Sequence, residues 1–231
     1  MNQDESRAPL IFDLETGPDQ REGALTRIRE NVTAPATYKK PESIAAWIAE
    51  NADRVADEQW RKTALDAAQG EIFVFGYAWG DEKPQTISRA PGFPERDFLE
   101  HIFDMVSERI EANDRRNPQF IGHNVRSFDL AFLWRRAVVN NIRPPFRIPW
   151  DVRPGDDRVY DTLERWTGGY GAPRISLDNL CHALGVESSK GDMDGSMVPQ
   201  AIMDGRMDEV TEYCRQDVVA TRECWRRMTF Q

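Results

Sequence analysis

The sequence predicts an α/β domain in which helices flank a mixed central β-sheet and one functional site lies at the strand ends. Short apolar runs bounded by turn residues alternate along the chain with longer segments whose apolar residues recur at helical spacing. The chain has 231 residues, of which 40% are hydrophobic and 30% are charged. These values are typical of a globular chain, and we expect one domain over residues 1–231.

The first strand is expected at Ala8–Leu14, because its apolar run is short and a Gly-Pro turn follows it. Residues 19–41 are mixed in charge, so we expect irregular structure there. Pro41–Ala68 predicts a helix, since a Pro-Glu-Ser segment opens it and apolar residues recur at near-helical spacing. A hairpin is then expected from the β-rich segment Glu71–Trp79 and the segment Pro84–Ala90.

The second half of the chain continues this alternation. Phe93–Ala112 predicts an amphipathic helix with its apolar side chains on one side. A short strand is expected at Gln119–Ile121, followed by a turn and a helix over about residues 127–140. Residues 141–158 are rich in proline and arginine, so they predict a loop before an edge strand at Val159–Asp161.

The chain is expected to close with a short helix that Ser176 caps, a polar loop at 188–196 and a long helix from about Arg206 to Met228. Several residues of the long helix form one stripe at spacings of three and four, and this stripe should face the core. It comprises Met207, Val210, Cys214, Asp217, Val218, Thr221, Trp225 and Met228.

The charge is unevenly distributed. The net charge of −9 argues against tight non-specific binding to nucleic acid. Residues 115–174, however, contain 11 arginines, no lysine and 6 acidic residues, a net charge of +5 beside −14 for the remainder. This pattern fits a protein that meets phosphates on one face, and an ordinary solvated arginine-rich surface is the alternative.

The cysteine content and the hydropathy of the chain indicate the cellular compartment in which we expect the protein. The three cysteines form no Cys-x-x-Cys pair, and an odd number closes no disulfide framework. No apolar run approaches the ~18 residues that span a bilayer. The polar, acid-containing N-terminus does not resemble a secretory signal. We therefore expect a cytoplasmic protein that does not contact a membrane.

Two acidic residues end the first predicted strand. Asp13 and Glu15 are two positions apart, so their side chains face the same side of the strand. Carboxylates this close repel each other, and each raises the pKa of the other. A divalent cation removes the repulsion and provides chemistry. The pair by itself is a weak signal, but charges avoid strand interiors unless they are paired or bind metal.

Two further acidic residues are candidates for the site. The charge of Asp217 would be costly at its position, whereas that of Asp129 would be favoured by a helix. Asp217 lies on the core-facing stripe, and Tyr213 precedes it by one helical turn. A salt bridge from Asp217 to Arg126 or Arg174 is the structural alternative, and Tyr213 alone is compatible with a core aromatic. Asp129 falls in the first turn of a helix, where the helix dipole favours a carboxylate with or without a function.

These segments together resemble the DEDD exonuclease superfamily. Asp-Leu-Glu-Thr at Asp13–Thr16, His-Asn-x-x-x-Phe-Asp at His123–Asp129 and Tyr-x-x-x-Asp at Tyr213–Asp217 occur in its order and rough spacing. The tyrosine is similar to that of the DEDDy branch. In particular, the chain is similar to stand-alone predicted 3′–5′ exonucleases related to the proofreading domain of family B DNA polymerases. Segments 34–44, 61–67 and 189–198 extend the likeness over nearly the whole chain, and it implies an RNase H-like fold.

The resemblance implies a site with two Mg²⁺ or Mn²⁺ ions, and a ligand set of oxygens alone suits these ions better than Zn²⁺. It implies that Asp13 bridges both ions, that Glu15 and Asp217 complete the site of the attacking water, and that Asp129 holds the second ion. Tyr213 would orient the water, because a phenol with a pKa of ~10 is too weak a base to take its proton unaided.

The resemblance also implies contacts to the substrate. Leu14, Thr16, Asn124 and Phe128 are expected beside the terminal nucleotides. His123 is included with them, although such a histidine is more often a structural hydrogen-bonding residue. Residues 19–68 look like a partly helical insertion after the first motif. We expect them to form a lid or wall beside the site.

The expected substrate is the 3′ end of DNA, with a polymerase or another replication or repair protein as a possible partner in trans. Three alternatives remain open. A 3′–5′ exoribonuclease would use the same residues, a non-catalytic nucleic-acid-binding module predicts the loss of a carboxylate, and a structural protein would not bind Mn²⁺.

Overall fold

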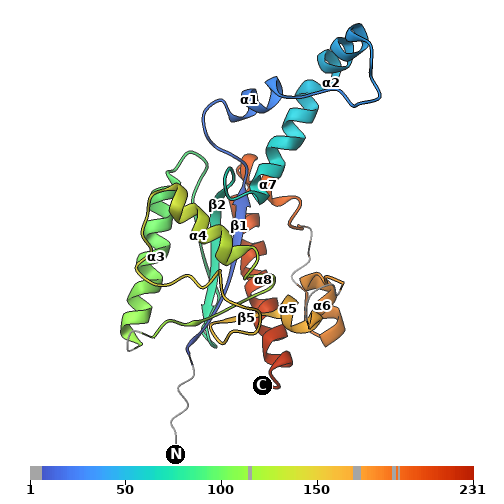
Figure 1. Ribbon diagram of the computed structural model, residues 1–231. Coiled ribbons are helices and arrows are strands. Elements are labelled where there is room, and N and C mark those ends of the chain that lie inside the picture. Colours follow the sequence, from blue (N-terminus) through green and yellow to red (C-terminus); the bar gives the residue numbers. More distant parts are fainter. Residues whose placement is uncertain (1–6, 114–115, 169–172, 189–190, 192) are drawn as a thin grey trace, which may run out of the picture.

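The central feature of the fold is a five-stranded mixed β-sheet with the strand order β3-β2-β1-β4-β5 (Figure 1). The computed structural model describes residues 7–113, 116–168, 173–188, 191 and 193–231. β1 pairs antiparallel with β2 and parallel with β4, and the sheet is therefore mixed, as predicted. The strands are β1 (Pro9–Gly17), β2 (Glu71–Trp79), β3 (Gln85–Ser88), β4 (Gln119–Gly122) and β5 (Val159–Asp161).

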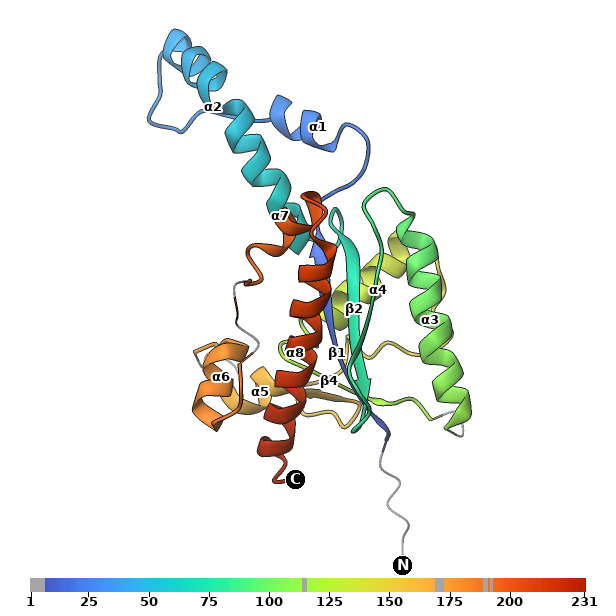
Figure 2. The same cartoon turned by 180° about the vertical axis from the view of Figure 1, so that it is seen from behind.

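Helices cover both faces of the sheet (Figures 1 and 2). α3 and α4 pack on one face, and α8 crosses the other beside the shorter helices α5 and α6. Among the described residues, no helix combines the length and hydropathy needed to cross a bilayer. The helices are α1 (Ala24–Glu30), α2 (Pro41–Lys62), α3 (Glu95–Ala112), α4 (Asp129–Val139), α5 (Thr162–Thr167), α6 (Leu177–Leu184), α7 (Val198–Met203) and α8 (Met207–Met228).

The alternation of side chains along β1 decides which residues face α8. Leu10, Phe12 and Leu14 are buried in the core formed with α3 and α4. Ile11 packs on the opposite face, against Val218 of α8. Because side chains two positions apart share a face, residues 13 and 15 point toward α8 as well. The apolar pattern of β1 thus directs its two acidic side chains to the last helix of the chain.

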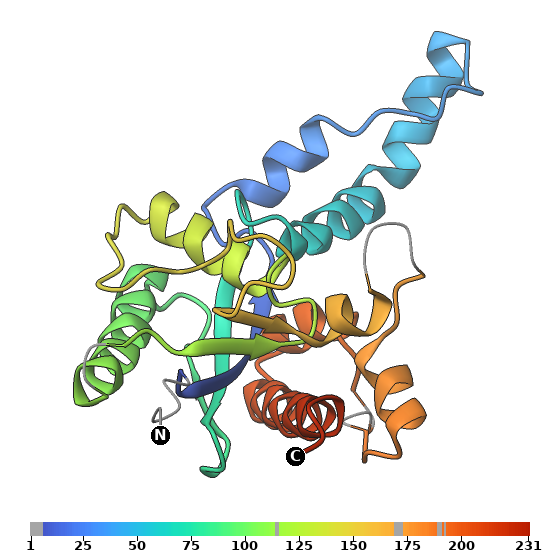
Figure 3. The same cartoon turned by 60° about the horizontal axis from the view of Figure 1, so that its bottom comes forward.

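An arm formed by α1 and α2 projects away from the sheet (Figure 3). We predicted irregular structure over residues 19–41, and this was wrong for α1. Its helix packs on α2 in a small cluster around the buried Val32, Ala52 and Ala56. This contact spans some twenty residues of sequence, and the local pattern of residues 19–41 does not reveal it. The expected helix over 41–68 ends at Lys62 and continues as one 3₁₀ turn, Thr63–Leu65.

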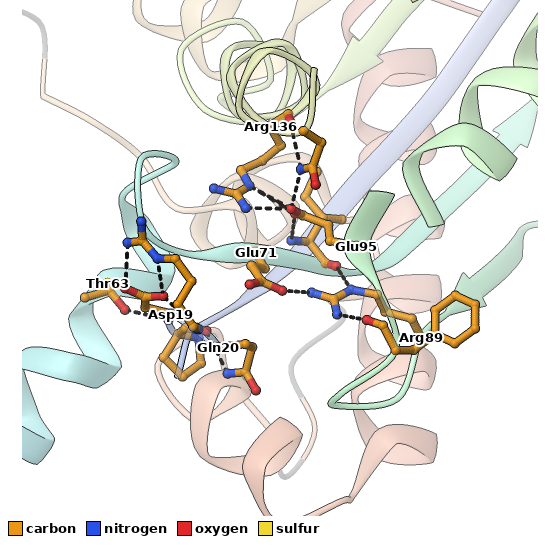
Figure 4. Close-up of polar contacts among 12 residues, drawn as sticks. Asp19, Gln20, Thr63, Glu71, Arg89, Glu95 and Arg136 are labelled. Carbon is orange, nitrogen blue, oxygen red and sulfur yellow. Dashed lines mark hydrogen bonds and ion pairs between the residues drawn. The ribbon is translucent and has the colours of Figure 1, made fainter. Parts of the chain in front are cut away.

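A network of hydrogen bonds and ion pairs around Asp19 holds the base of the arm (Figure 4). The Asp19 carboxylate is fully buried and forms ion pairs with Arg21 at 2.7 Å and Arg27 at 3.1 Å. The Asp19 backbone N–H donates to Thr63 Oγ1 at 2.9 Å, and Trp60 Nε1–H donates to the Asp19 carbonyl at 2.8 Å. These bonds join the segment that follows β1 to the C-terminal end of α2, so the two ends of the arm are held together.

A second polar cluster ties α3 and α4 to the sheet (Figure 4). Arg136 of α4 donates to the Glu95 carboxylate of α3 through Nε at 3.0 Å and Nη2 at 2.6 Å. Glu95 Oε1 also accepts the Ile72 backbone N–H of β2 at 2.8 Å, and Arg136 Nη1 donates to the Ala67 carbonyl at 3.0 Å. Both charged side chains are buried, so each depends on the other for its charge partner.

Candidate active site

The three sequence segments that carry the predicted acids meet beside β1 (Figure 1). β1 pairs with β4 only from Pro9 to Ile11, so the second half of β1 extends beyond the end of β4. The Leu14 backbone N–H therefore has no strand partner on that side. It donates to Asp129 Oδ1 at 3.1 Å, which places this carboxylate between the positions of Asp13 and Glu15. The start of α4 thus takes the place that β4 leaves.

Asp13 and Glu15 face the middle of α8. A carboxylate oxygen of each and the Sγ atom of Cys214 all lie within 4.8 Å of one another. The charge of Asp217, half-buried and one helical turn further along α8, raises the pKa values of Asp13, Glu15 and Asp129. Four carboxylates therefore share one electrostatic environment.

Burial and mutual repulsion make the ionised form of this cluster costly. Burial raises the pKa of Asp13 and that of Glu15 well above their ordinary values, and the neighbouring carboxylates raise them further. Burial also raises the pKa of Asp129 to about 8, although the Leu14 N–H bond opposes the shift. A divalent cation would relieve both the burial and the repulsion.

The Glu15 Oε1 atom is placed as a ligand of a bound cation would be. Glu15 is only 7% exposed, and its Oε1 atom is buried without a hydrogen-bond partner among the described residues. A buried carboxylate oxygen without a partner costs several kcal/mol unless an ion or a proton satisfies it. The oxygen-rich donor set is the kind that Mg²⁺ and Mn²⁺ prefer. The residues present therefore fit the hard divalent ions that the resemblance implied.

The metal-free protein is expected to lose stability as the pH rises from about 4 to about 8. Asp129 shows the sign: its pKa is raised from the ordinary value of 3.8 to about 8 in the folded chain. Between these values the folded protein holds a proton that the unfolded chain has released, so each increase in pH favours unfolding. Melting temperatures measured in EDTA across this range should fall.

Asp129→Asn provides the control for this titration, because an amide in its place cannot ionise. The fall in melting temperature between about pH 4 and 8 should be shallower in this variant. Addition of Mn²⁺ should stabilise the native protein most at the upper end of the range, where protons no longer compete for the carboxylates. A melting temperature in EDTA that rises over this interval would contradict the assignment.

Tyr213 lies beside the acids, one turn before Asp217 on α8. Burial raises its pKa above the ordinary tyrosine value, and the charges of Asp217, Glu15 and Asp13 add to the shift. The phenol therefore stays protonated and can act only as a hydrogen-bonding group. A Cβ atom at Gly195 would lie 3.8 Å from the Tyr213 hydroxyl, so the loop before α7 passes close to this group at a residue without a side chain.

The turn between β4 and α4 is held by an acid that the sequence analysis did not single out. Asp161, at the end of β5, is buried, and its Oδ1 accepts the Asn124 N–H at 2.9 Å. Its Oδ2 accepts the Arg126 N–H at 3.1 Å. Asn124 adopts a left-handed conformation with φ 62°, which asparagine tolerates better than most residues. The sequence signal was present: Asp161 also caps α5 by accepting the Leu163 N–H at 3.1 Å.

His123 and Asn124 are engaged with neighbouring segments. His123 Nε2 lies 3.0 Å from the Ile175 carbonyl, and Nδ1 lies 3.0 Å from Thr162 Oγ1. Burial lowers the pKa of His123, so the ring is neutral, with the proton assigned to Nε2 because a carbonyl only accepts. Both ring nitrogens are thus used within the protein. The Asn124 side-chain oxygen accepts from Arg174 Nη2 at 2.7 Å on the exposed side.

The remaining predicted substrate contacts differ in exposure. The side chains of Leu14 and Thr16 are buried. The register with β2 shifts between Glu15 and Thr16, which marks a bulge at the end of the first motif. Phe128 is partly buried with its ring 5.5 Å from that of Phe132. The alternative partners of Asp217 have other contacts: Arg126 pairs with Glu164, and Arg174 with Asn124.

Comparison with known sequences identifies one family. Residues 85–231 match the family described as "Predicted 3'-5' exonuclease related to the exonuclease domain of PolB". The matched region contains Asp129, Tyr213 and Asp217 and begins after Asp13 and Glu15. It is therefore the three-dimensional structure that brings the first motif to the matched ones. A search of curated proteins finds no match.

Comparison with solved structures concerns the fold. The family B DNA polymerase from the hyperthermophilic archaeon Pyrobaculum calidifontis aligns with a TM-score of 0.57 and 15% sequence identity. The alignment covers 97% of this chain and 24% of the polymerase, so the chain spans about a quarter of that protein. With the sheet order and flanking helices described above, this likeness confirms the predicted RNase H-like fold.

Proposed function

The chain belongs to the family of predicted 3′–5′ exonucleases related to the exonuclease domain of PolB, and on that premise we propose that it shortens DNA from the 3′ end by two-metal-ion hydrolysis. The products would be nucleoside 5′-monophosphates. The observation that supports this best is the convergence of Asp13, Glu15, Asp129 and Asp217, with one buried carboxylate oxygen of Glu15 left without a partner. Such a cluster is costly without cations and suited to them.

The proposed roles follow from the placement of the side chains. Two Mg²⁺ or Mn²⁺ ions would supply an activated water and stabilise the leaving oxygen. Asp13 shares the cluster with Glu15, Asp217 and Asp129, whose charges all raise its pKa, and we propose that it helps to hold both ions. Glu15 and Asp217 would hold the ion beside the water, and Asp129 would hold the other. Leu14 and Thr16 would meet the terminal nucleotide through their backbone, and Asn124 and Phe128 would border it.

A single assay tests the proposal. Single-stranded DNA and RNA of one sequence, labelled at the 3′ or the 5′ end, are incubated with the protein and Mn²⁺, Mg²⁺ or EDTA. Metal-dependent shortening from the 3′ end supports an exonuclease, and the ratio of DNA to RNA cleavage separates the deoxyribonuclease from the ribonuclease. Failure to cleave either polymer, combined with no Mn²⁺-induced rise in melting temperature, would refute the proposal.

Tyr213→Phe is expected to lower kcat by roughly 10- to 100-fold while leaving the fold intact. The change removes one hydroxyl, and a hydrogen bond to a charged group contributes about 1.5–3 kcal/mol. Because the phenol is protonated, the loss reports on orientation of the water and not on a missing base. Single-turnover cleavage measures the effect. Tyr160→Phe, at another partly buried tyrosine on β5, is the matched control and should cost less than about threefold.

We further propose that residues 19–68 are an insertion in a single exonuclease domain and that the arm forms a wall along the path of the DNA. β1 runs from the acids directly into the arm, whose base is braced at Asp19. Lys39 and Lys40 are exposed near its far end, beside the exposed Tyr38, whose ring lies 6.1 Å from that of Trp47. Cations interleaved with aromatic rings suit a single strand.

Lys39→Glu together with Lys40→Glu is expected to weaken binding of single-stranded DNA and to reduce its salt dependence. If each lysine meets a phosphate, the slope of log affinity against log salt should become less negative by about 1.4. Fluorescence anisotropy over a range of NaCl concentrations, in an inactive Asp217→Asn background, measures it. Lys83→Glu, in the turn between β2 and β3, is the matched control. An unchanged slope would exclude the arm as a contact for the strand.

A further inference from the structure

A buried sulfur atom lies inside the acid cluster. Cys214 follows Tyr213 on α8 and is fully buried, with its Sγ atom 3.5 Å from Asp13 Oδ2 and 3.6 Å from the Asp13 carbonyl oxygen. The same Sγ atom belongs to the group in which Asp13 and Glu15 oxygens lie within 4.8 Å of one another. The proposed hydrolysis by hard cations does not require this thiol.

The sheet provides space for the sulfur at one position. A Cβ atom at Gly76 of β2 would lie 2.7 Å from Cys214 Sγ and 3.1 Å from a methyl carbon of Val218. Any larger residue at Gly76 would therefore displace the thiol. The other two cysteines contact each other instead, with Cys181 Sγ 3.5 Å from Cys224 Sγ. Among the described residues, Cys214 is thus the sulfur that faces the acids.

A carboxylate oxygen of Glu15, in the same cluster as the Cys214 sulfur, also has an unmet need for a cation or a hydrogen-bond donor. Glu15 Oε1 is buried without a hydrogen-bond partner among the described residues, and the Glu15 side chain belongs to the same group as the Cys214 sulfur. A carboxylate pair alone suits hard ions such as Mg²⁺ and Mn²⁺. A thiolate added to it changes the preference, because sulfur ligands select soft or borderline ions such as Cd²⁺ and Zn²⁺.

We propose that Cys214, Asp13 and Glu15 form a binding site for a thiophilic divalent cation, with Cd²⁺ or Zn²⁺ as its chemical class. On binding, the S–H bond breaks, the sulfur–metal bond forms and the proton passes to solvent. The oxidation state of sulfur and metal is unchanged. The occupied site excludes the hard ion that Asp13 and Glu15 would otherwise hold, so the thiophilic ion inhibits the nuclease. The inhibition rests on the proposed function, whereas the binding does not.

The test is a Cd²⁺ titration of the metal-free full chain, followed by the ultraviolet thiolate-to-cadmium charge-transfer absorption. The native protein and Cys224→Ala, which removes one thiol of the Cys181–Cys224 pair, should both show the band. Cys214→Ser should lack it and should bind Cd²⁺ at least about tenfold more weakly in competition with a chromophoric chelator. A cooperative melting transition in the absence of Cd²⁺, measured on the same three proteins, verifies that each is folded.

The outcomes separate the metal site from the nuclease. No band in the native protein, or a band that survives in Cys214→Ser and vanishes in Cys224→Ala, overturns the proposal. Cleavage with Mn²⁺ is then measured at a fixed Cd²⁺ concentration, and the fraction that survives should be larger in Cys214→Ser than in the native protein. An equal fraction overturns the inhibition. If Mn²⁺ supports no cleavage while the Cys214-dependent band appears, the proposed function has failed and the cation site stands.

Discussion

Asp13→Asn is expected to reduce exonuclease activity by about 10³-fold or more and, at the same time, to stabilise the metal-free protein. The carboxylate is one of the four proposed to hold the ions, so its loss removes several kcal/mol of the proposed stabilisation of the transition state, at 1.36 kcal/mol for each factor of ten. In the absence of metal, burial and repulsion by Glu15, Asp217 and Asp129 raise the pKa of the same carboxylate, so its ionisation destabilises the folded protein. An amide carries no charge, and its oxygen can still accept from Cys214.

The magnitude of the stabilisation follows from the removed charge. An unsatisfied buried polar group costs about 1–3 kcal/mol, and a charged group costs more, so removal of this charge should stabilise the metal-free protein by at least about that amount. The NH₂ group of the amide can also donate to the unpartnered Glu15 oxygen. For a chain of this length, each kcal/mol raises the melting temperature by about 2–4 °C. Thermal unfolding in EDTA measures the increase. With Mn²⁺ the order should reverse, because the native protein gains binding energy that the variant lacks.

Asp208→Asn is the matched control for this experiment. Asp208 lies in the first turn of α8, is exposed, and does not belong to the acid cluster. Its replacement should change activity by less than about twofold. Opposite signs of the activity and stability effects at Asp13 would distinguish a functional carboxylate from a residue that merely supports the fold. If Asp13→Asn destabilised the protein in EDTA, a structural role would be the correct interpretation.

Arg136→Met is expected to lower the free energy of unfolding by about 3–5 kcal/mol. Arg136 and Glu95 are 6% and 3% exposed at their side chains, so the change leaves a carboxylate buried without its cation. Glu95 also holds the Ile72 N–H of β2, and Arg136 holds the Ala67 carbonyl, so the pair joins α3 and α4 to the sheet. Urea unfolding measures the loss, which corresponds to roughly 6–20 °C in melting temperature.

A double variant identifies the cause of the loss. Adding Glu95→Gln to Arg136→Met removes the unpaired charge, while the glutamine oxygen can still accept the Ile72 N–H, so most of the stability should return. Arg54→Met is the matched control, because the Arg54–Glu58 pair on α2 is exposed at 60% and 54% and should contribute less than about 1 kcal/mol. If the double variant were no more stable than Arg136→Met, the loss would come from packing and not from the buried charge.

Local patterns in the sequence were sufficient to predict much of the fold and the direction in which several acidic side chains point. The two-residue period of β1 directs Asp13 and Glu15 to one face, and the helical stripe of α8 turns Asp217 and Cys214 toward the core. Both periods are properties of the backbone itself, so they hold whatever the rest of the chain does. The order of the longer helices and the strands around the sheet followed from the same signals, which missed the short helices α1, α5 and α7.

Other features depended on contacts between distant segments, and only the tertiary structure decided them. Asp129 occupies its position because β4 ends before the middle of β1 and leaves the Leu14 N–H without a strand partner. Asp161 at the end of β5 supports the turn at Asn124, and Gly76 of β2 makes room for the Cys214 sulfur of α8. A local period determines the direction in which a side chain points. Which atoms it meets depends on where a distant strand or helix ends, and no periodicity encodes that.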